Sequence, residues 1–343
     1  MSQKEKKKSW KERQRERQIK QQRAQDAHQI EIEKEAKSKP RKWPKGKILA
    51  VVCVLVLIFG AIGAWQLTNS STPSEEEPVI PTGGSIYIRP DGQVSPETAP
   101  LVNTGNDHYT LTADINIPIF VGRDNIVIDG ANHAIQGSDE LGSSGIDLTG
   151  RTNVTMTNMK ISGFDYGIYL NSASNNVISN NDFTNNYCGI WVVVSSNDNT
   201  ISDNNIENNQ MWAIFMKESS NNVISKNEMT SHLNYTIYIR QSNFTTFSEN
   251  YIANNRMGIY FYEASDNTVY HNSFVNNGNA YAGAISSSDS TNTFDNGKEG
   301  NYWSNYQSVY PNATEVGSSG IWNTPYVIDD NNQDNYPLVD PWT

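Results

Sequence analysis

The sequence has very little cysteine. Cys53 and Cys188 are the two cysteines in 343 residues, and they form no Cys-x-x-Cys pair and no zinc-type spacing with histidine. A disulfide framework and a structural zinc site are therefore excluded as the basis of the fold. We expect Cys188 to pack as a small apolar residue rather than to act as a nucleophile.

Basic residues are scarce over most of the chain. Residues 1–47 hold 17 lysines and arginines against 7 acidic residues, whereas residues 48–343 hold 9 basic against 30 acidic residues. The net charge of −11 therefore combines a basic leader with a strongly acidic remainder. The leader has no aromatic or glycine-rich motif of a nucleic-acid-binding segment, so no nucleic-acid partner is expected.

Charged residues are absent from residues 48–67, where a run of about 20 mostly apolar residues is long enough to cross the roughly 30 Å hydrocarbon layer of a membrane as a helix. Lysines and arginines precede this run and Glu75, Glu76 and Glu77 follow it. The positive-inside rule then places the N-terminus in the cytoplasm and the remainder outside. A cleavable signal peptide is the alternative, but the long basic leader and the long apolar run argue against it.

These features predict a single-pass protein of the cell membrane with five parts. The predicted parts are a basic cytoplasmic leader (1–47), a transmembrane anchor (48–67), a flexible linker (68–84), a solenoid (85–306, with 85–120 as its N-terminal cap) and a C-terminal cap (307–343).

A repeat of about 22 residues dominates the part after the linker. Its units begin with a small residue followed by an alternating strand, as in Gly145-Ile-Asp-Leu and Gly167-Ile-Tyr-Leu, and they recur at spacings of 22, 22, 24, 23 and 22 residues. Apolar residues alternate with period 2, which excludes helical repeats. Short strands stacked about 4.8 Å apart would give an all-β fold, a right-handed parallel β-helix of about eight coils.

Stacking of such coils turns repeated residues into columns. One predicted apolar column consists of Ile146, Ile168, Ile190, Ile214, Ile237 and Ile259, and a second of Leu148, Leu170, Val192, Met216, Ile239 and Phe261. A third column, Asn181, Asn204, Asn227, Asn250 and Asn272, predicts a ladder of side-chain amides that hydrogen-bond from coil to coil.

Several segments resemble a known family. They are Ser85-Ile-Tyr-Ile-Arg-Pro-Asp-Gly92, Asp124 to Gly130, the Gly-Ile-Tyr-Leu units and Gly300-Asn-Tyr-Trp-Ser-Asn-Tyr306. Over nearly all of residues 85–343 the chain is similar to NosD-type repeat proteins, in the carbohydrate-binding and sugar-hydrolase class of right-handed parallel β-helices. The resemblance implies this fold and a surface location; the family contains binders, accessory proteins for copper enzymes and enzymes that act on polysaccharides.

The third residue of each unit is predicted to point outward. This column is aromatic in five successive coils: Tyr169, Trp191, Phe215, Tyr238 and Tyr260. Aromatic rings match the flat faces of sugars, so the column is our candidate ligand-binding site for a polysaccharide or another cell-surface glycan. The alternative is that stacked rings only stabilise the parallel sheet.

A second outward column places Lys217 beside Arg240, with Glu218 and Glu263 in the column that follows. Two adjacent cations repel each other, so either these glutamates or an acidic sugar should compensate them. If the protein is an enzyme, these four residues are the catalytic candidates of a surface polysaccharide lyase or hydrolase, although the sequence has no paired-aspartate motif of a hydrolase.

Metal ligands form no cluster in the sequence. His108, His133, His232 and His271 are scattered, and Met216 and Met229 fall in core columns, so no metal and no cofactor is expected. The sequence thus favours a membrane-anchored external β-helix that binds a polymer through an aromatic column. A surface lyase or hydrolase acting on acidic glycans and a structural or adhesive stalk without a ligand are the two alternatives.

Overall fold

The computed structural model describes residues 84–105, 107–278 and 285–342. The predicted leader, the predicted anchor and all but Gly84 of the predicted linker lie outside these residues. Within the described ranges, no helix is long and apolar enough to cross a membrane. The one α-helix in the same ranges is the single turn α3 (Tyr306–Val309), so this part of the chain is all-β as expected.

The repeat region forms three sheets whose strands come from successive coils. In chain order, sheet A contains β1 (Ile86–Ile88), β2 (Val94–Ser95), β5 (Ile119–Val121), β8 (Ser144–Asp147), β11 (Tyr166–Asn171), β14 (Cys188–Val193), β17 (Trp212–Lys217), β20 (Tyr235–Arg240), β23 (Met257–Tyr262) and β26 (Ile285–Ser288). Sheet B contains β3 (Leu101–Thr104), β4 (His108–Leu111), β6 (Ile126–Asp129), β9 (Val154–Thr157), β12 (Val177–Ser179), β15 (Thr200–Ser202), β18 (Val223–Ser225), β21 (Thr246–Ser248) and β24 (Thr268–Tyr270). Sheet C contains β7 (Ala134–Gln136), β10 (Lys160–Ser162), β13 (Asp182–Thr184), β16 (Asn205–Glu207), β19 (Glu228–Thr230), β22 (Tyr251–Ala253), β25 (Ser273–Val275) and β27 (Tyr302–Trp303).

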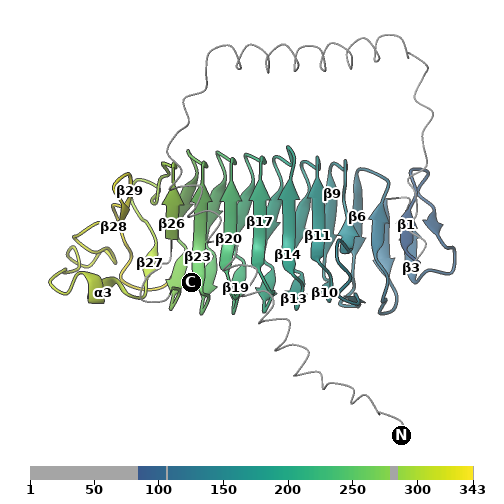
Figure 1. The fold of residues 1–343 in the computed structure, drawn as a ribbon, viewed down its shortest axis with the longest axis horizontal. Coiled ribbons are helices and arrows are strands. Elements are labelled where there is room, and N and C mark those ends of the chain that lie inside the picture. The colour runs from purple at the N-terminus through teal and green to yellow at the C-terminus, as the bar shows by residue number, and fades with distance from the viewer. Residues whose placement is uncertain (1–83, 106, 279–284, 343) are drawn as a thin grey trace, which may run out of the picture. The chain divides into compact units, whose positions relative to one another are not determined.

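Each coil from β5 to β25 contributes one strand to each sheet, and the strands of successive coils pair in parallel. In sheet A, Ile168 is paired with Ile190, Ile190 with Ile214 and Ile214 with Ile237. Figure 1 shows β11, β14, β17, β20, β23 and β26 side by side in chain order. The predicted parallel β-helix of about eight coils is therefore confirmed.

The apolar columns fill the interior of the coils. All six members of the predicted isoleucine column and all six of the neighbouring column have 0% exposure. Cys188 is also fully buried, and burial raises the pKa of its thiol, so the thiol packs as an apolar group as expected. Gly167, which precedes Ile168, has no room for a side chain, because an added Cβ would lie 2.5 Å from the carbonyl oxygen of Gly189.

The predicted asparagine ladder is present and runs beyond the five predicted residues. The Nδ2 of Asn204 donates to Asn227 at 2.9 Å, Asn227 donates to Asn250 at 3.0 Å, and the ladder continues through Asn272 to Asn301. Each amide also donates to a backbone carbonyl, as Asn227 does to Ile201. The ladder ends at the buried carboxylate of Asp334, which accepts from the backbone N–H of Asn301 at 2.7 Å.

Two further ladders occupy the other corners and were not predicted. One links Asn176, Asn199 and Asn222, is interrupted by Thr245, and resumes from Asn267 to Asn292. The other links Asn186, Asn209, His232, Asn255 and Asn277. Buried backbone N–H and carbonyl groups at the corners thereby obtain partners that the strands do not supply.

Antiparallel strands and a short hairpin close the two ends. At the N-terminal end, β2 pairs with β1 and β3 pairs with β4, both antiparallel. At the C-terminal end, β28 (Tyr326–Asp329) and β29 (Asn332–Asp334) form an antiparallel pair. Tyr326 stacks on Trp303 with ring centroids 4.2 Å apart, so this hairpin covers the last coil with aromatic side chains.

Candidate functional site

The predicted aromatic column lies on the outer face of sheet A. Tyr169 is paired with Trp191, Trp191 with Phe215, Phe215 with Tyr238 and Tyr238 with Tyr260. All five side chains are partly exposed, while the residues before and after each of them are buried. The strand alternation thus presents one aromatic side chain per coil on the outer surface.

The rings in the middle of this column stack on each other. Phe215 lies 3.9 Å from Trp191 at an interplanar angle of 12° and 5.4 Å from Tyr238 at 6°. Both faces of Phe215 are therefore covered by neighbouring rings, which stabilises the sheet and leaves its edge outward. Between Tyr238 and Tyr260 the planes turn by 62°, and the regular stack ends there.

A second set of aromatic side chains borders this column and was missed in the sequence. Tyr166, Trp212 and Tyr235 begin the strands β11, β17 and β20, each immediately before the small or threonine residue that opens a unit. The repeat spacing places them in one column with Cys188 and Met257. This column contains different residue types, so a search for columns of one residue type does not find it. Only the position of these residues, one before the first residue of each repeat unit, could have indicated them.

Trp212 differs from the stacked rings in its orientation. It meets Trp191 at 64°, Phe215 at 55° and Tyr238 at 61°, and its contact with Tyr187 is edge-on at 88°. Among the described residues, no ring lies parallel to Trp212, so neither of its faces is occupied by a stacked neighbour. Its indole Nε1 is buried and has no hydrogen-bond partner among these residues. We define Tyr166, Tyr169, Trp191, Trp212, Phe215, Tyr235, Tyr238 and Tyr260 as the aromatic face.

Four phenols of the aromatic face are neutral at physiological pH. Burial raises the pKa of Tyr166, Tyr235 and Tyr238 and raises that of Tyr260 to about 12. A neutral phenol both donates and accepts a hydrogen bond. The aromatic face therefore combines apolar rings with hydroxyl groups that match those of a sugar.

Two cations border the aromatic face, as predicted. Lys217 and Arg240 are paired neighbours on β17 and β20. The Nζ of Lys217 lies 3.0 Å from Oε1 of Glu218, so a glutamate compensates this cation. The guanidinium of Arg240 lies 5.2 Å from the ring centroid of Tyr262, while its Nε is buried without a hydrogen-bond partner among the described residues.

The four catalytic candidates do not assemble into one acid–base pair. Glu218 is bonded to Lys217, whereas Glu263 accepts a hydrogen bond from Gln241 at 2.9 Å. Glu218 follows β17 and Glu263 follows β23, two coils further on, a rise of about 10 Å along the stack. The structure therefore brings Lys217 together with Glu218 and with Arg240, and leaves Glu263 apart.

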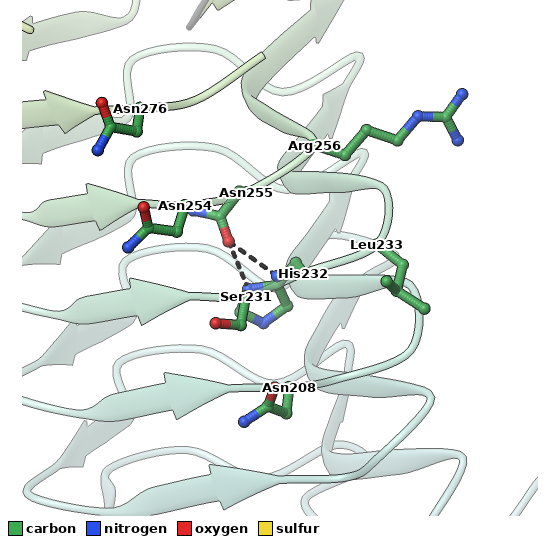
Figure 2. A pocket seen from close by; sticks show the side chains of 8 residues that line it. All are labelled: Asn208, Ser231, His232, Leu233, Asn254, Asn255, Arg256 and Asn276. Atoms are coloured by element: carbon green, nitrogen blue, oxygen red, sulfur yellow. Dashed lines mark hydrogen bonds between the residues drawn. The ribbon is translucent and has the colours of Figure 1, made fainter. Parts of the chain in front are cut away.

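A shallow hollow near His232 does not form a convergent site. Its lining includes Asn208, His232, Asn254 and Arg256. Figure 2 shows Arg256 and Leu233 extending to one side while the asparagines lie on the other. His232 itself is buried in the amide ladder, where it contacts Asn209 and Asn255. The imidazole is thus used inside the fold rather than at the surface.

A copper site would need a cluster of imidazole, thiolate or thioether donors. In the ranges that the structure describes, no three His, Cys, Asp or Glu side chains are grouped to hold a metal ion. Cys188, Met216 and Met229 are fully buried. His133 and His271 are paired with Asp114 and Glu299, respectively. The donors present in these ranges do not fit copper.

Comparison with solved structures finds matches at low identity. The periplasmic alginate epimerase AlgG is 20% identical with a TM-score of 0.45, and the match covers 53% of this chain and 47% of that one. Tailspike protein 2 of bacteriophage CBA120 is 15% identical with a TM-score of 0.44, covering 55% and 34% of the two chains. The A-module of the Azotobacter vinelandii mannuronan C-5 epimerase AlgE4 is 13% identical with a TM-score of 0.38, covering 62% and 77%.

The match to AlgG spans about half of the length of that protein. Among curated protein sequences, none matches this chain. The family model described as "Periplasmic copper-binding protein (NosD)" matches residues 113–308, more than half of the chain and most of its coils. The chain therefore belongs to the NosD family of parallel β-helix repeat proteins.

Proposed function

We propose that this protein is a membrane-anchored, extracytoplasmic β-helix that binds a polysaccharide or another cell-surface polymer on its aromatic face. The observation that carries the proposal is the gathering of eight partly exposed aromatic side chains on one face of sheet A. Contiguous apolar patches on a protein surface often mark ligand-binding sites or interaction sites.

The geometry of the rings distinguishes those that bind from those that support. Phe215 is covered on both faces by Trp191 and Tyr238 and therefore supports the sheet. Trp212 meets its neighbours at interplanar angles of 55° to 88° and has no parallel ring on either face among the described residues. Trp212 is therefore the side chain best oriented to stack against the flat face of a sugar ring.

The length of the aromatic face favours a polymer over a single sugar. The column from Tyr169 to Tyr260 spans five coils, which corresponds to roughly 19 Å along the stack. Lys217 and Arg240 flank its C-terminal half and are unusual in a part of the chain with 9 basic against 30 acidic residues. Within the described sheets, they are the only two basic residues that are paired on neighbouring strands. An acidic polymer could bind to them.

The anchoring and location rest on the sequence alone. The uncharged run at 48–67 and the basic residues before it support a single membrane span with the β-helix outside. The acidic linker after the run would hold the β-helix away from the membrane surface. The partners in this proposal are therefore one membrane and one external glycan.

The test is retention of the full-length protein on immobilised polysaccharides, both neutral (mannan, amylose) and acidic (alginate, polygalacturonate). We expect at least one polymer to retain the protein, with affinity lowered at least tenfold by Trp212→Ala. Phe215→Leu is the matched control, because it removes a covered ring of the same face. Absence of retention on every polymer, or retention that survives both Trp212→Ala and the double variant Trp191→Ala/Tyr238→Ala, would favour a structural stalk.

The enzymatic alternative has a separate measurement. Incubation with the acidic polymers is followed by assays for unsaturated chain ends and for reducing ends, which report lyase and hydrolase activity. We expect neither, because Glu218 and Glu263 each have their own partner and lie two coils apart. New ends that depend on Lys217 and Arg240 would replace the binding proposal with a catalytic one.

A further inference from the structure

A second hollow lies at the C-terminal cap, on different elements from the aromatic face. It has a volume of about 280 Å³ and is lined by Tyr302, Tyr306, Gln307, Trp322, Val339 and Asp340, together with Trp303 and Ser304. We propose that this hollow binds one neutral pyranose sugar ring. The proposal is independent of polymer binding on sheet A.

Three chain segments meet to form the hollow. Leu338 forms a parallel bridge with Tyr302 and an antiparallel bridge with Ile321. The backbone N–H of Trp322 donates to the carbonyl of Pro337 at 2.9 Å. Val339 and Asp340 therefore leave this junction beside both the last coil and the Trp322 segment. The hollow is built by backbone pairing and does not depend on a loop of free conformation.

The aromatic wall of the hollow is fixed in place. Trp322 stacks on Tyr306 with centroids 5.0 Å apart and planes at 11°, and the Tyr306 hydroxyl donates to the carbonyl of Thr324. Trp303 lies between Phe274 and Tyr326, parallel to both, so its two faces are occupied. Among the described residues, Trp322 has a parallel ring on one face only, and this leaves one indole face for a ligand.

Three of the polar side chains that line the hollow have no partner within the described part of the fold. The amide of Gln307, the carboxylate of Asp340 and the hydroxyl of Tyr302 make no hydrogen bond or ion pair with any of the described residues. A carboxylate accepts two hydrogen bonds, an amide donates and accepts, and a phenol does both. One flat aromatic face with such a set of donors and acceptors matches the apolar face and the hydroxyl groups of a pyranose.

Size and charge narrow the ligand class. A volume of about 280 Å³ is at the lower end of small-molecule sites, which favours one ring over an oligosaccharide. The lining contains Asp340 and no lysine, arginine or histidine. A uronate or a sugar phosphate would place its negative charge beside this carboxylate, whereas a neutral hexose would not. The two proposed sites therefore differ in the charge that they accept.

The test is saturation-transfer NMR on the full-length protein with free glucose, mannose and galactose, each titrated to saturation, and with glucuronate for comparison. We expect at least one neutral sugar to bind saturably and glucuronate to bind at least tenfold more weakly. Trp322→Ala should lower the affinity at least tenfold, and Asp340→Asn and Gln307→Ala should each lower it severalfold. Leu141→Ser is the control: Leu141 is exposed and belongs to neither site, so this variant should leave monosaccharide binding unchanged. Trp212→Ala reports any sugar that binds on the aromatic face instead.

Asp340 and Gln307 are exposed, so their variants keep the test valid if Trp322→Ala fails to fold. Absence of saturable binding of all three neutral sugars would overturn the proposal, as would binding that is unchanged in Asp340→Asn and Gln307→Ala. Loss of the monosaccharide signal in Trp212→Ala would also overturn it, because the sugar would then occupy the aromatic face. Polymer retention is measured separately, so either site can fail without the other.

Discussion

His232 takes the place of an asparagine above Asn255. Its backbone N–H donates to Oδ1 of Asn255 at 2.9 Å, and its ring Nδ1 lies 3.0 Å from the same oxygen. On the other side, Nε2 lies 3.4 Å from Nδ2 of Asn209. A neutral imidazole with its proton on Nδ1 satisfies both contacts, because Nδ1 then donates to Asn255 and Nε2 accepts from Asn209.

The first prediction concerns the pH dependence that His232 introduces. Burial lowers the pKa of His232 to about 4, so between pH 6.5 and 4 the unfolded chain binds a proton that the folded chain excludes. Stability should therefore be lost as the pH falls through this window, by up to about 3 kcal/mol. In His232→Asn the ladder regains its usual residue, and thermal melts from pH 4 to 7.5 should show a smaller loss. Equal slopes for the two proteins would contradict this.

Asp334 predicts the opposite trend at the C-terminal end. Burial raises the pKa of Asp334 to about 7, so as the pH rises from about 4 to 7 the unfolded chain releases a proton that the folded chain retains. The contribution to stability should decrease over this window. Asp334→Asn does not titrate and retains an oxygen that accepts from Asn301 and Trp303, while its amide nitrogen replaces the oxygen that accepts from Tyr336. Melts of Asp334→Asn, compared with the wild type at pH 5 and 8, should show a smaller decrease; an unchanged decrease would count against this role.

The asparagine ladder predicts a large effect for an interior amide. Asn227 donates to the carbonyls of Ile201 and Ser225 and to Asn250, and accepts from Asn204. Asn227→Ala leaves these buried groups without partners, at about 1–3 kcal/mol each, so urea unfolding should show a loss of several kcal/mol. The control is Asn208→Gly, an exposed turn residue with φ of 52°, which should change stability little. Comparable losses in the two variants would contradict the ladder's role.

The stacked rings predict a separation of stability from binding. Phe215→Leu removes a ring that stacks on Trp191 and Tyr238, and should lower stability by about 0.5–1.5 kcal/mol beyond the loss of buried area. Trp212→Ala should have the larger effect on polymer retention. Urea unfolding and retention are measured on both variants. If Phe215→Leu abolished retention while leaving stability intact, the division between supporting and binding rings would be wrong.

Columns of uniform residues made much of this fold predictable. The isoleucine column and the Asn181 ladder were found because every coil repeats the same residue type. The other two ladders were missed because Thr245 and His232 interrupt them. That the imidazole of His232 can replace an asparagine amide is evident only from its contacts with Asn209 and Asn255. Trp212 and Tyr235 were missed because Cys188 and Met257 share their column.

The C-terminal hollow had no signal in the sequence for a different reason. Residues after Tyr306 do not repeat, so they have no column against which Gln307, Trp322 or Asp340 could be compared. Their proximity follows from the bridges of Leu338 with Tyr302 and Ile321, which join positions 36 and 17 residues apart. Such long-range pairings are set by tertiary packing rather than by local pattern.

The amide ladders all run in the same direction. Wherever two asparagines are neighbours in a ladder, the Nδ2 of the first donates to the one in the following coil, as from Asn204 to Asn227 and from Asn227 to Asn250. Only the ladder that ends next to Asp334 is terminated by a carboxylate. Duplicating one complete coil between two asparagines would lengthen the column without disturbing either terminus. The length of the β-helix can thus change in evolution by one coil at a time. Coils added after Asp334 would instead require a new acceptor to end the asparagine ladder.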